Sequence, residues 1–496
     1  MGNPNNTSTD SILQDHKTST QSNINSISFI RSIKDWWSCP TQLMYDSNKT
    51  TQSKKYEEAK LKNRIIEYEL FRAILPDEIY IKHPINEESA SESDTTEKKE
   101  HKIIGELLDD ELDDGTFIHE FFISNNEKSD KEVHIVIIHG YMAALGYFIK
   151  NIEPLAKIPG IKLHLIDLPG FGNSSRPKFP TQFLKTPTTK KEQILQILEI
   201  ENWFIDKIEN WRIKRNINKF KLIAHSMGAY LSCCYLMKYN IQQDNSKLVD
   251  QIILVSPMGT ESNPISLIND SKYDINLNFK SNALNELKFE DEINNDQIII
   301  NEEFTKIWEK LGQPKFPKNL ILKYIWENNY SPFQILQKTG PLYSKLLSYW
   351  SFQRFKNFEE NSNNSNDFDS KKDDKIELIL KLHNYSYSIF NQFQISGELA
   401  ITKFINHEIL AKLPLCDRGL VDFFVNNNIN NYWIYGDKDW MNYKGGEYIF
   451  EKIQSKSKKS DRSVVSKFEI LPNSGHHIYL DNPKLFNERI LEFFDL

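Results

Sequence analysis

Three polar residues that lie far apart in the chain have the side-chain types that acyl transfer requires. Ser226 stands in the sequence LIAHSMGA, where an apolar run meets small residues, as in a sharp strand-to-helix turn that exposes a serine hydroxyl. A serine hydroxyl is a poor nucleophile, so it needs a base within hydrogen-bond reach and an acid that orients the base. His476, after Gly475, is the candidate base, and Asp439, after Gly436, is the candidate acid. The pattern predicts attack of Ser226 on an acyl carbonyl.

Two other carboxylates near these residues leave alternatives open. Asp437 is the alternative acid, although an aspartate after a strand often serves only to shape a turn. Asp481 follows His476 by five positions, and these two residues form a candidate acyltransferase motif. The alternative role of Asp481 is to favour the start of the final helix through its negative charge.

Negative charge that develops on the carbonyl oxygen needs hydrogen-bond donors that are already in place. One donor is expected to be the backbone N–H of Met227, directly after the serine. The other is expected to be the backbone N–H of Tyr141, in the loop after an apolar strand. We interpret the His139 side chain as a structural support of that loop. His225 is interpreted as a packing residue of the turn, and His477 has no assigned role.

The elements that must position these residues alternate between strands and helices. Runs typical of strands lie at 118–123, 133–138, 163–166, 220–223, 252–255, 432–435 and 468–471, and helices are expected at 190–213 and 483–494. This alternation is typical of a mostly parallel sheet covered on both faces. Ser226, Asp439 and His476 would then follow strand ends, in the chain order of alpha/beta-hydrolases. The predicted class is an α/β fold of the alpha/beta-hydrolase type.

Composition divides the chain into six predicted parts. Residues 1–25 are expected to be disordered, 26–85 to form a helical, interfacial segment, and 86–101 to be a charged linker. The hydrolase core is expected at 102–259 and again at 429–496. Residues 260–428 interrupt the alternation with helical, aromatic sequence, so they are expected to form an inserted cap, with a disordered loop near 360–374.

Charge, cysteine content and hydropathy exclude several functional classes. The formal net charge of −7 argues against a nucleic-acid binder. The four cysteines lack metal-ligand spacing and are interpreted as free thiols of a reducing compartment. The serine mechanism itself needs no metal or organic cofactor, so none is expected. No run approaches the roughly 20 apolar residues of a membrane span. Residues 1–25 lack the apolar core of a secretory signal and the arginines of a mitochondrial presequence.

Residues 27–37 form an amphipathic segment with two interpretations. Ile30, Ile33 and Trp37 recur at helical spacing, beside basic residues and next to Trp36. Paired tryptophans suit the lipid–water interface, which predicts a helix that lies on a membrane surface. The alternative is a helix packed on the catalytic domain.

Several motifs resemble those of a known family. DLPGFGNSSRP at 167–177 looks like the loop after a strand in the alpha/beta-hydrolase lipid enzymes related to the comparative-gene-identification lipolysis coactivator. Similar motifs are ENWF at 201–204, ENWR at 209–212, QISGE at 394–398, GHHIYLD at 475–481 and WSCPT at 37–41. The resemblance covers most of residues 36–496. Within this family the chain most resembles the fungal cardiolipin-specific deacylase and its lysophosphatidic acid acyltransferase relatives.

The resemblance implies acyl-ester chemistry on phospholipids by a peripheral membrane protein. For the deacylase it implies removal of one acyl chain from cardiolipin, before remodelling with another chain, at the mitochondrial inner membrane. One alternative is acyl-CoA-dependent acylation of lysophosphatidic acid on the same fold. The other is a non-catalytic lipase coactivator at a lipid-droplet, endoplasmic-reticulum or cytoplasmic surface. The coactivator branch has lost its serine nucleophile, whereas Ser226 is present here, and Ala224 replaces the first glycine of the turn.

Overall fold

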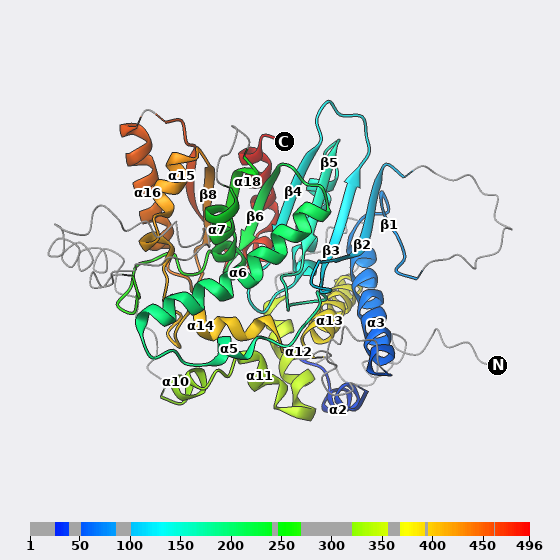
Figure 1. Cartoon of the computed structure of the whole chain (residues 1–496). Coiled ribbons are helices and arrows are strands. Elements are labelled where there is room, and N and C mark those ends of the chain that lie inside the picture. The colour runs from blue at the N-terminus through cyan, green and yellow to red at the C-terminus, as the bar shows by residue number, and fades with distance from the viewer. Residues whose placement is uncertain are drawn as a thin grey trace, which may run out of the picture.

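The computed structural model describes residues 25–38, 51–85, 101–240, 247–268, 320–355, 368–391, 395–460 and 462–496 (Figure 1). Three predicted parts lie wholly or partly outside this set. They are residues 1–24 of the disordered terminus, residues 86–100 of the charged linker, and residues 269–319 of the cap. The loop predicted near 360–374 also lies outside it up to residue 367. From Phe368 onward its residues belong to helix α13 (Phe368–Asn391), so this helix begins within the loop that was predicted to be disordered.

The strands within these ranges form one sheet, with the order β1-β2-β3-β5-β4-β6-β7-β8-β9. They are β1 (Ile79–Ile81), β2 (Ile103–Glu111), β3 (Phe117–Asn125), β4 (Val133–Ile138), β5 (Ile161–Ile166), β6 (Phe220–His225), β7 (Val249–Val255), β8 (Asn430–Gly436) and β9 (Ser466–Leu471). β3 is antiparallel to β2 and β5, and the remaining neighbours are parallel. The predicted mostly parallel sheet is confirmed.

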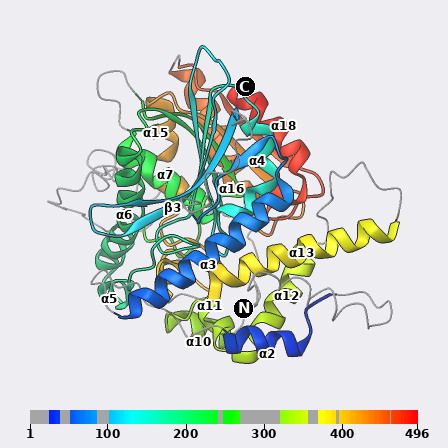
Figure 2. The same cartoon turned by 90° about the vertical axis from the view of Figure 1, so that its right-hand side faces the viewer.

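Helices cover both faces of the sheet because its central strands are apolar on both sides. One face carries α6 (Lys190–Lys214), α7 (Met227–Tyr239), α15 (Leu420–Asn426) and α16 (Tyr443–Lys459). The other face carries α3 (Thr51–Ile74), α4 (Ile149–Ala156) and α18 (Pro483–Phe494) (Figure 2). Alternate residues of β4 enter the two hydrophobic clusters: Val136 and Ile138 pack on the first face, and Ile135 and Ile137 on the second.

Helices rather than further strands of the sheet fill the described part of the chain between β7 and β8. They are α10 (Leu320–Glu327), α11 (Pro332–Gln337), α12 (Tyr343–Arg354), α13, α14 (Ile401–Phe404) and α15. Helices α10 to α14 gather at one end of the molecule (Figure 1). The N-terminal segment joins them, because α3 packs along α13 (Figure 2) and α2 (Phe29–Ser38) packs on α12. This segment also supplies β1 to the sheet edge, so it is part of the folded unit.

Helix α2 is held to the cap by polar contacts on one side. Ser32 Oγ donates to Pro341 O at 2.6 Å and accepts from Lys345 N at 2.9 Å, and Ser344 Oγ donates to Asp35 Oδ2 at 2.6 Å. The packed alternative therefore describes this side of α2. Within the described ranges, no helix has both the length and the apolar character needed to cross a bilayer.

Candidate active site

Ser226 lies in the turn between β6 and α7, where the sequence places it. Its backbone has φ 53° and ψ −117°, a conformation that a residue with a side chain adopts only under strain. The Ser226 N–H donates to Val255 O at 2.9 Å, and Ser226 O accepts from Met258 N at 3.2 Å, so the strand next to β6 holds the turn. The loop after β4 also lies against it, since a Cβ added to Gly140 would be 2.7 Å from Ser226 Cβ.

The structure brings Ser226, His476 and Asp439 into one hydrogen-bonded chain. His476 Nε2 lies 3.0 Å from Ser226 Oγ, and His476 Nδ1 lies 3.0 Å from Asp439 Oδ1. A carboxylate can only accept, so the neutral ring carries its proton on Nδ1 and offers the Nε2 lone pair to the hydroxyl. Ser226 is 4% exposed, and the side chains of His476 and Asp439 are 8% and 1% exposed. This geometry suits removal of the hydroxyl proton by the ring.

The two aspartates after β8 have different positions. Asp439 faces His476, and its Oδ1 also accepts from Met441 N at 2.9 Å. Asp437 instead accepts from the backbone N–H of Ser474 at 2.9 Å, which joins the loop after β8 to the histidine loop. This backbone hydrogen bond lowers the pKa of Asp437. Asp439 therefore has the geometry of the acid, and Asp437 shapes the turn.

The loop after β4 is supported by His139. Its Nδ1–H donates to Gly140 O at 2.8 Å, and its Nε2 accepts from Leu168 N at 2.9 Å. Burial lowers the pKa of His139 to about 4, so the ring is neutral. Tyr141 follows in this loop, and Met227 is the first residue of α7, where backbone N–H groups have no acceptor within the helix. The two amides predicted to bind the oxyanion thus belong to the segments beside Ser226.

The histidine loop has supports that the sequence did not reveal. His225 Nε2–H donates to His476 O at 2.9 Å, so His225 does more than pack in the turn. Asp481 Oδ2 accepts from Gly475 N at 2.9 Å, and its Oδ1 pairs with Arg354 Nη1 at 2.8 Å. The hydrogen bonds of Asp481 therefore go to the backbone of the loop and to the cap, while the His476 ring bonds to Ser226 and Asp439.

Trp440 is a further residue beside the candidate base that sequence reasoning missed. Its ring centre lies 4.4 Å from that of His476, with the planes tilted by 42°. Trp440 is 52% exposed, so it contacts the ring of His476 while about half of its own surface faces solvent. In the sequence, only its position directly after the candidate acid Asp439 could have indicated that Trp440 lies beside His476.

One cluster outside this site has the donor types of a metal centre. Glu67, His119 and Asp167 are buried and close together. However, His119 Nε2 lies 2.6 Å from Glu67 Oε2, and its Nδ1 lies 3.2 Å from Asp109 Oδ1. Burial acts to lower the pKa of His119, but the flanking carboxylates raise it to about 9. Both oxygens of Asp167 accept from backbone N–H groups, Oδ1 from Leu145 at 2.8 Å and Oδ2 from Asn173 at 2.7 Å. Because these groups already have partners within the protein, we interpret the cluster as a network of ion pairs and hydrogen bonds.

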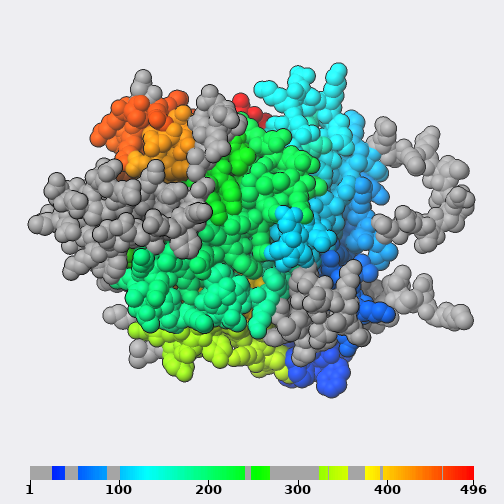
Figure 3. Space-filling view, in the orientation of Figure 1, coloured from blue at the N-terminus to red at the C-terminus, as the bar shows by residue number. Residues whose placement is uncertain are grey.

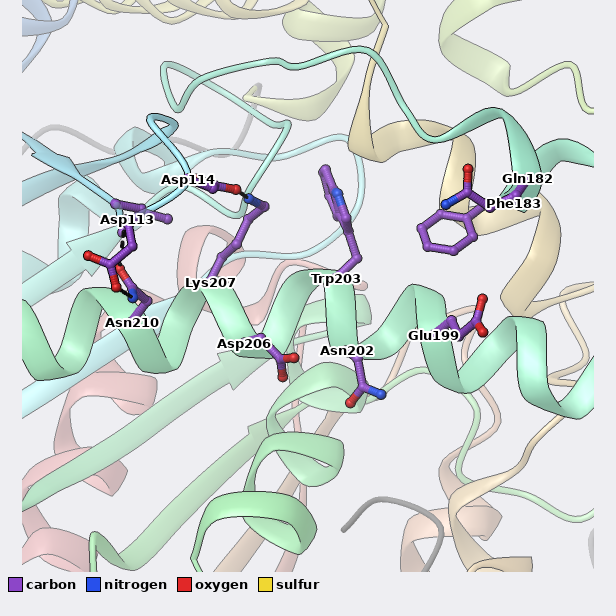
Figure 4. Close-up of a pocket in the computed structure, with 11 residues that line it drawn as sticks. Asp113, Asp114, Gln182, Phe183, Glu199, Asn202, Trp203, Asp206, Lys207 and Asn210 are labelled. Carbon is purple, nitrogen blue, oxygen red and sulfur yellow. Dashed lines mark hydrogen bonds and ion pairs between the residues drawn. The ribbon is translucent and has the colours of Figure 1, made fainter. Parts of the chain in front are cut away.

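A surface groove of about 600 Å³ runs along α6, between the β2–β3 turn and the segment that contains Phe183 (Figure 4). Several of its polar groups bond to one another: Lys207 pairs with Asp114, and Asn210 donates to Asp113. No serine, cysteine or histidine is among the residues that line it. We therefore assign it no part in the chemistry of Ser226.

Comparisons with known proteins match the fold and the motifs. The family model described as alpha/beta hydrolase fold matches residues 133–483. The chain is 28% identical to Protein ECM18 of Saccharomyces cerevisiae, over 76% of this chain and 74% of that protein. It is 25% identical to the 1-acylglycerol-3-phosphate O-acyltransferase of Arabidopsis thaliana, over 72% of this chain and 65% of that protein. It is 26% identical to the 1-acylglycerol-3-phosphate O-acyltransferase ICT1 of Saccharomyces cerevisiae, over 76% of this chain and 85% of that protein. Since the family model covers more than half of the sequence, the chain belongs to the alpha/beta-hydrolase fold family.

Proposed function

We propose that the protein is a serine-dependent phospholipid acyl-ester hydrolase, and specifically a cardiolipin deacylase of the phospholipase A type. The hydrogen-bonded chain of Ser226, His476 and Asp439 carries the proposal of an ester hydrolase. The lipid substrate is supported by the family motifs and by relatives that are named as acyltransferases of lysophospholipids. Cardiolipin is the finer proposal, and it rests on the motif resemblance alone.

In the proposed reaction, Ser226 Oγ attacks the acyl carbonyl while its proton moves to His476 Nε2. Asp439 stabilises the resulting imidazolium through the Nδ1–H. The backbone N–H groups of Met227 and Tyr141 donate to the oxyanion. Collapse of the tetrahedral intermediate breaks the ester bond, and the leaving glycerol oxygen takes the proton from Nε2. Water then attacks the acyl-enzyme with His476 as the base, which releases the fatty acid and restores Ser226.

The second candidate function is acyl transfer to lysophosphatidic acid from acyl-CoA. The names of the Arabidopsis and ICT1 relatives favour it. The same acyl-enzyme would form, with CoA thiol as the leaving group and a lysolipid hydroxyl in place of water. A non-catalytic lipase coactivator is less compatible with the site, because its hydrogen-bonded Ser226, His476 and Asp439 would serve no purpose.

The test compares purified wild-type protein with Ser226→Ala on cardiolipin, on other phospholipids, and on lysophosphatidic acid with acyl-CoA. Asp437→Asn is the matched control, because it changes a nearby carboxylate that does not contact His476. Release of fatty acid and monolysocardiolipin by the wild type and by Asp437→Asn, but not by Ser226→Ala, would support the proposal. Equal release by Ser226→Ala would overturn the serine mechanism. Acyl transfer without hydrolysis would favour the acyltransferase.

The outer side of α2 supports peripheral membrane binding. Trp37 is 81% exposed and Ile30 is 66% exposed, on the side of α2 away from its polar contacts with the cap. The cap residues next to α2 add further exposed apolar side chains, which are Leu342, Leu346 and Tyr349. Figure 3 shows α2, in dark blue, at the lower edge of the molecule beside the yellow-green cap helices. We propose that this surface binds a phospholipid bilayer, and that the cardiolipin-containing inner mitochondrial membrane is its location.

Vesicle sedimentation tests the membrane surface. Trp37→Ser and Ile30→Ser together should weaken binding to phosphatidylcholine–cardiolipin vesicles at least about tenfold, since each fully buried side chain of this size contributes roughly 1.5–3 kcal/mol. Val465→Ser is the control, because Val465 is another exposed apolar residue, at 46%, and it lies next to the edge strand β9 rather than on α2. Equal weakening by Val465→Ser, or no weakening by the double change, would contradict the assignment. Fractionation of cells would test the mitochondrial location.

A further inference from the structure

We propose that Arg354 of the cap, acting through Asp481, is a positioning residue for the catalytic histidine loop. The inference rests on the proposed function of Ser226, His476 and Asp439 and extends it to a residue outside the hydrolase core. Arg354 is the last residue of α12, and it reaches Asp481 across 127 positions of sequence. Its consequence is that the cap contributes to the geometry of the base and does more than cover the site.

Arg354 and Asp481 hold the loop from both ends of the His476 backbone. Arg354 Nη1 donates to Asp481 Oδ1 at 2.8 Å, and Arg354 Nη2 donates to His477 O at 3.3 Å. Asp481 Oδ2 accepts from Gly475 N at 2.9 Å. The contacts therefore fall on the residues directly before and after His476. Both side chains are largely buried, at 14% and 10% exposure, so the pair excludes water from the back of the loop.

The histidines beside this pair, His225 and His477, are buried near the positive charge of Arg354. Burial lowers the pKa of His225 and of His477 well below the usual range, and the positive charge of Arg354 lowers both further. Both rings are therefore neutral at neutral pH. The titratable and charged groups of the loop that holds His476 and of the elements packed on it are Asp439, Asp437 and Lys438 after β8, His225 at the end of β6, His477 and Asp481 on the same segment, and Arg354 on α12. Arg354 and Asp481 cancel each other within this set.

Among the residues that the structure describes, two other buried ion pairs join the cap to the core, and neither reaches the histidine loop. Arg418 donates to both oxygens of Glu201, at 2.8 and 2.9 Å, next to α7. Arg176 pairs with Glu398. These pairs anchor the cap in the same way as Arg354, so they provide a matched control for general loss of cap stability.

The test measures how fast a fluorophosphonate labels Ser226 as a function of pH, which reports activation of the hydroxyl without a lipid substrate. In this reaction Ser226 Oγ bonds to phosphorus, fluoride leaves, and the serine proton passes to His476. Arg354→Met and Asp481→Asn should each lower the maximal rate about 10- to 100-fold, because a small displacement of the base has effects of this size. Arg354→Lys should recover part of the rate, and Arg418→Met should keep the wild-type rate and profile.

The pH below which labelling slows, the acidic limb of the rate–pH profile, distinguishes a positioning role of Arg354 from a general loss of cap stability. Asp481→Asn leaves the cation of Arg354 uncompensated, which disfavours the imidazolium and moves the limb to lower pH. Arg354→Met leaves the carboxylate uncompensated and moves the limb to higher pH. The double variant should return the limb towards its wild-type position while the maximal rate stays low.

Three outcomes would overturn the inference or its basis. Limbs that stay in place or move in the same direction in both single variants would refute the role of the pair. If Arg354→Met lowered the labelling rate no more than Arg418→Met does, Arg354 would stabilise only the attachment of the cap and would not position His476. If Arg354→Met does not fold, the milder Arg354→Lys and Asp481→Asn decide the same question. Absence of labelling in the wild type would instead overturn the proposed serine mechanism.

Discussion

The strained backbone at Ser226 predicts that two inactive variants differ in stability. With φ at 53° and ψ at −117°, Ser226 occupies a region that costs a residue with a side chain about 1–3 kcal/mol. Ser226→Ala removes the hydroxyl and its hydrogen bond to His476 but retains Cβ and the strain. Ser226→Gly removes the same hydrogen bond and also removes Cβ, so the turn is relieved.

The magnitude follows from two opposing terms. Relief of strain favours the folded state of Ser226→Gly by about 1–3 kcal/mol, while the greater freedom of glycine in the unfolded chain costs about 0.5–1 kcal/mol. Ser226→Gly should therefore exceed Ser226→Ala in free energy of unfolding by about 1 kcal/mol. In a folded unit of this size, that difference corresponds to about 2 °C in melting temperature.

Urea unfolding and thermal melting of both variants provide the assay, and fluorophosphonate labelling should be absent from both. Ser232 is the matched control, because it is a buried serine with ordinary helical backbone inside α7, the helix that follows Ser226. There the order should reverse, with Ser232→Gly less stable than Ser232→Ala by about 1 kcal/mol. If Ser226→Ala were as stable as Ser226→Gly, the turn would hold no strain and this reasoning would be refuted.

Three further predictions concern the site and its surroundings. Asp439→Asn should lower kcat about 10³- to 10⁴-fold and Asp437→Asn less than about tenfold, and comparable losses would contradict the choice of acid. His119 has its pKa raised from 6.5 to about 9, so its stabilisation, roughly 3 kcal/mol, is complete below pH 6.5 and is lost as pH rises through 9. Melting temperatures should show this loss in the wild type but not in His119→Gln. Gly140→Ala should abolish labelling of Ser226, because its Cβ would be 2.7 Å from Ser226 Cβ, and unchanged labelling would show that the loop yields easily.

The positions of Ser226, Asp439 and His476 could be predicted because each follows a strand of a parallel sheet. The carboxyl ends of β6, β8 and β9 meet at one edge, so residues 250 positions apart in sequence come within hydrogen-bond distance. The final helix was equally readable, since Pro483 opens α18 and the side chain of Asn482 accepts from Leu485 N at 3.4 Å. In these cases a short stretch of sequence identifies the residue, and the fold brings it to its partners.

The strand β2 was not predicted, and its sequence ends in acidic residues, which are uncommon in strands. In the structure these charges have partners on other elements. Asp109 pairs with Arg64 and with Lys60 of α3, and Asp110 accepts from Trp211 of α6 at 3.1 Å. Such partners lie far away in the sequence, so they cannot be predicted from hydrophobic periodicity. Arg354 escaped prediction for the same reason.

The geometry of Asp481 also changes what the His476–Asp481 spacing can indicate. A carboxylate that acted directly in acyl transfer would have to face the ring or the acyl acceptor, but its two oxygens bond to Arg354 and to the backbone of Gly475. The spacing is thus explained by support of the histidine loop, which hydrolysis and acyl transfer need equally. The choice between them must depend on which hydroxyl reaches the acyl-enzyme. Because Ser226 and His476 are almost fully buried, we expect access of the acceptor to these two residues, rather than the identity of the triad, to separate water from a lysolipid.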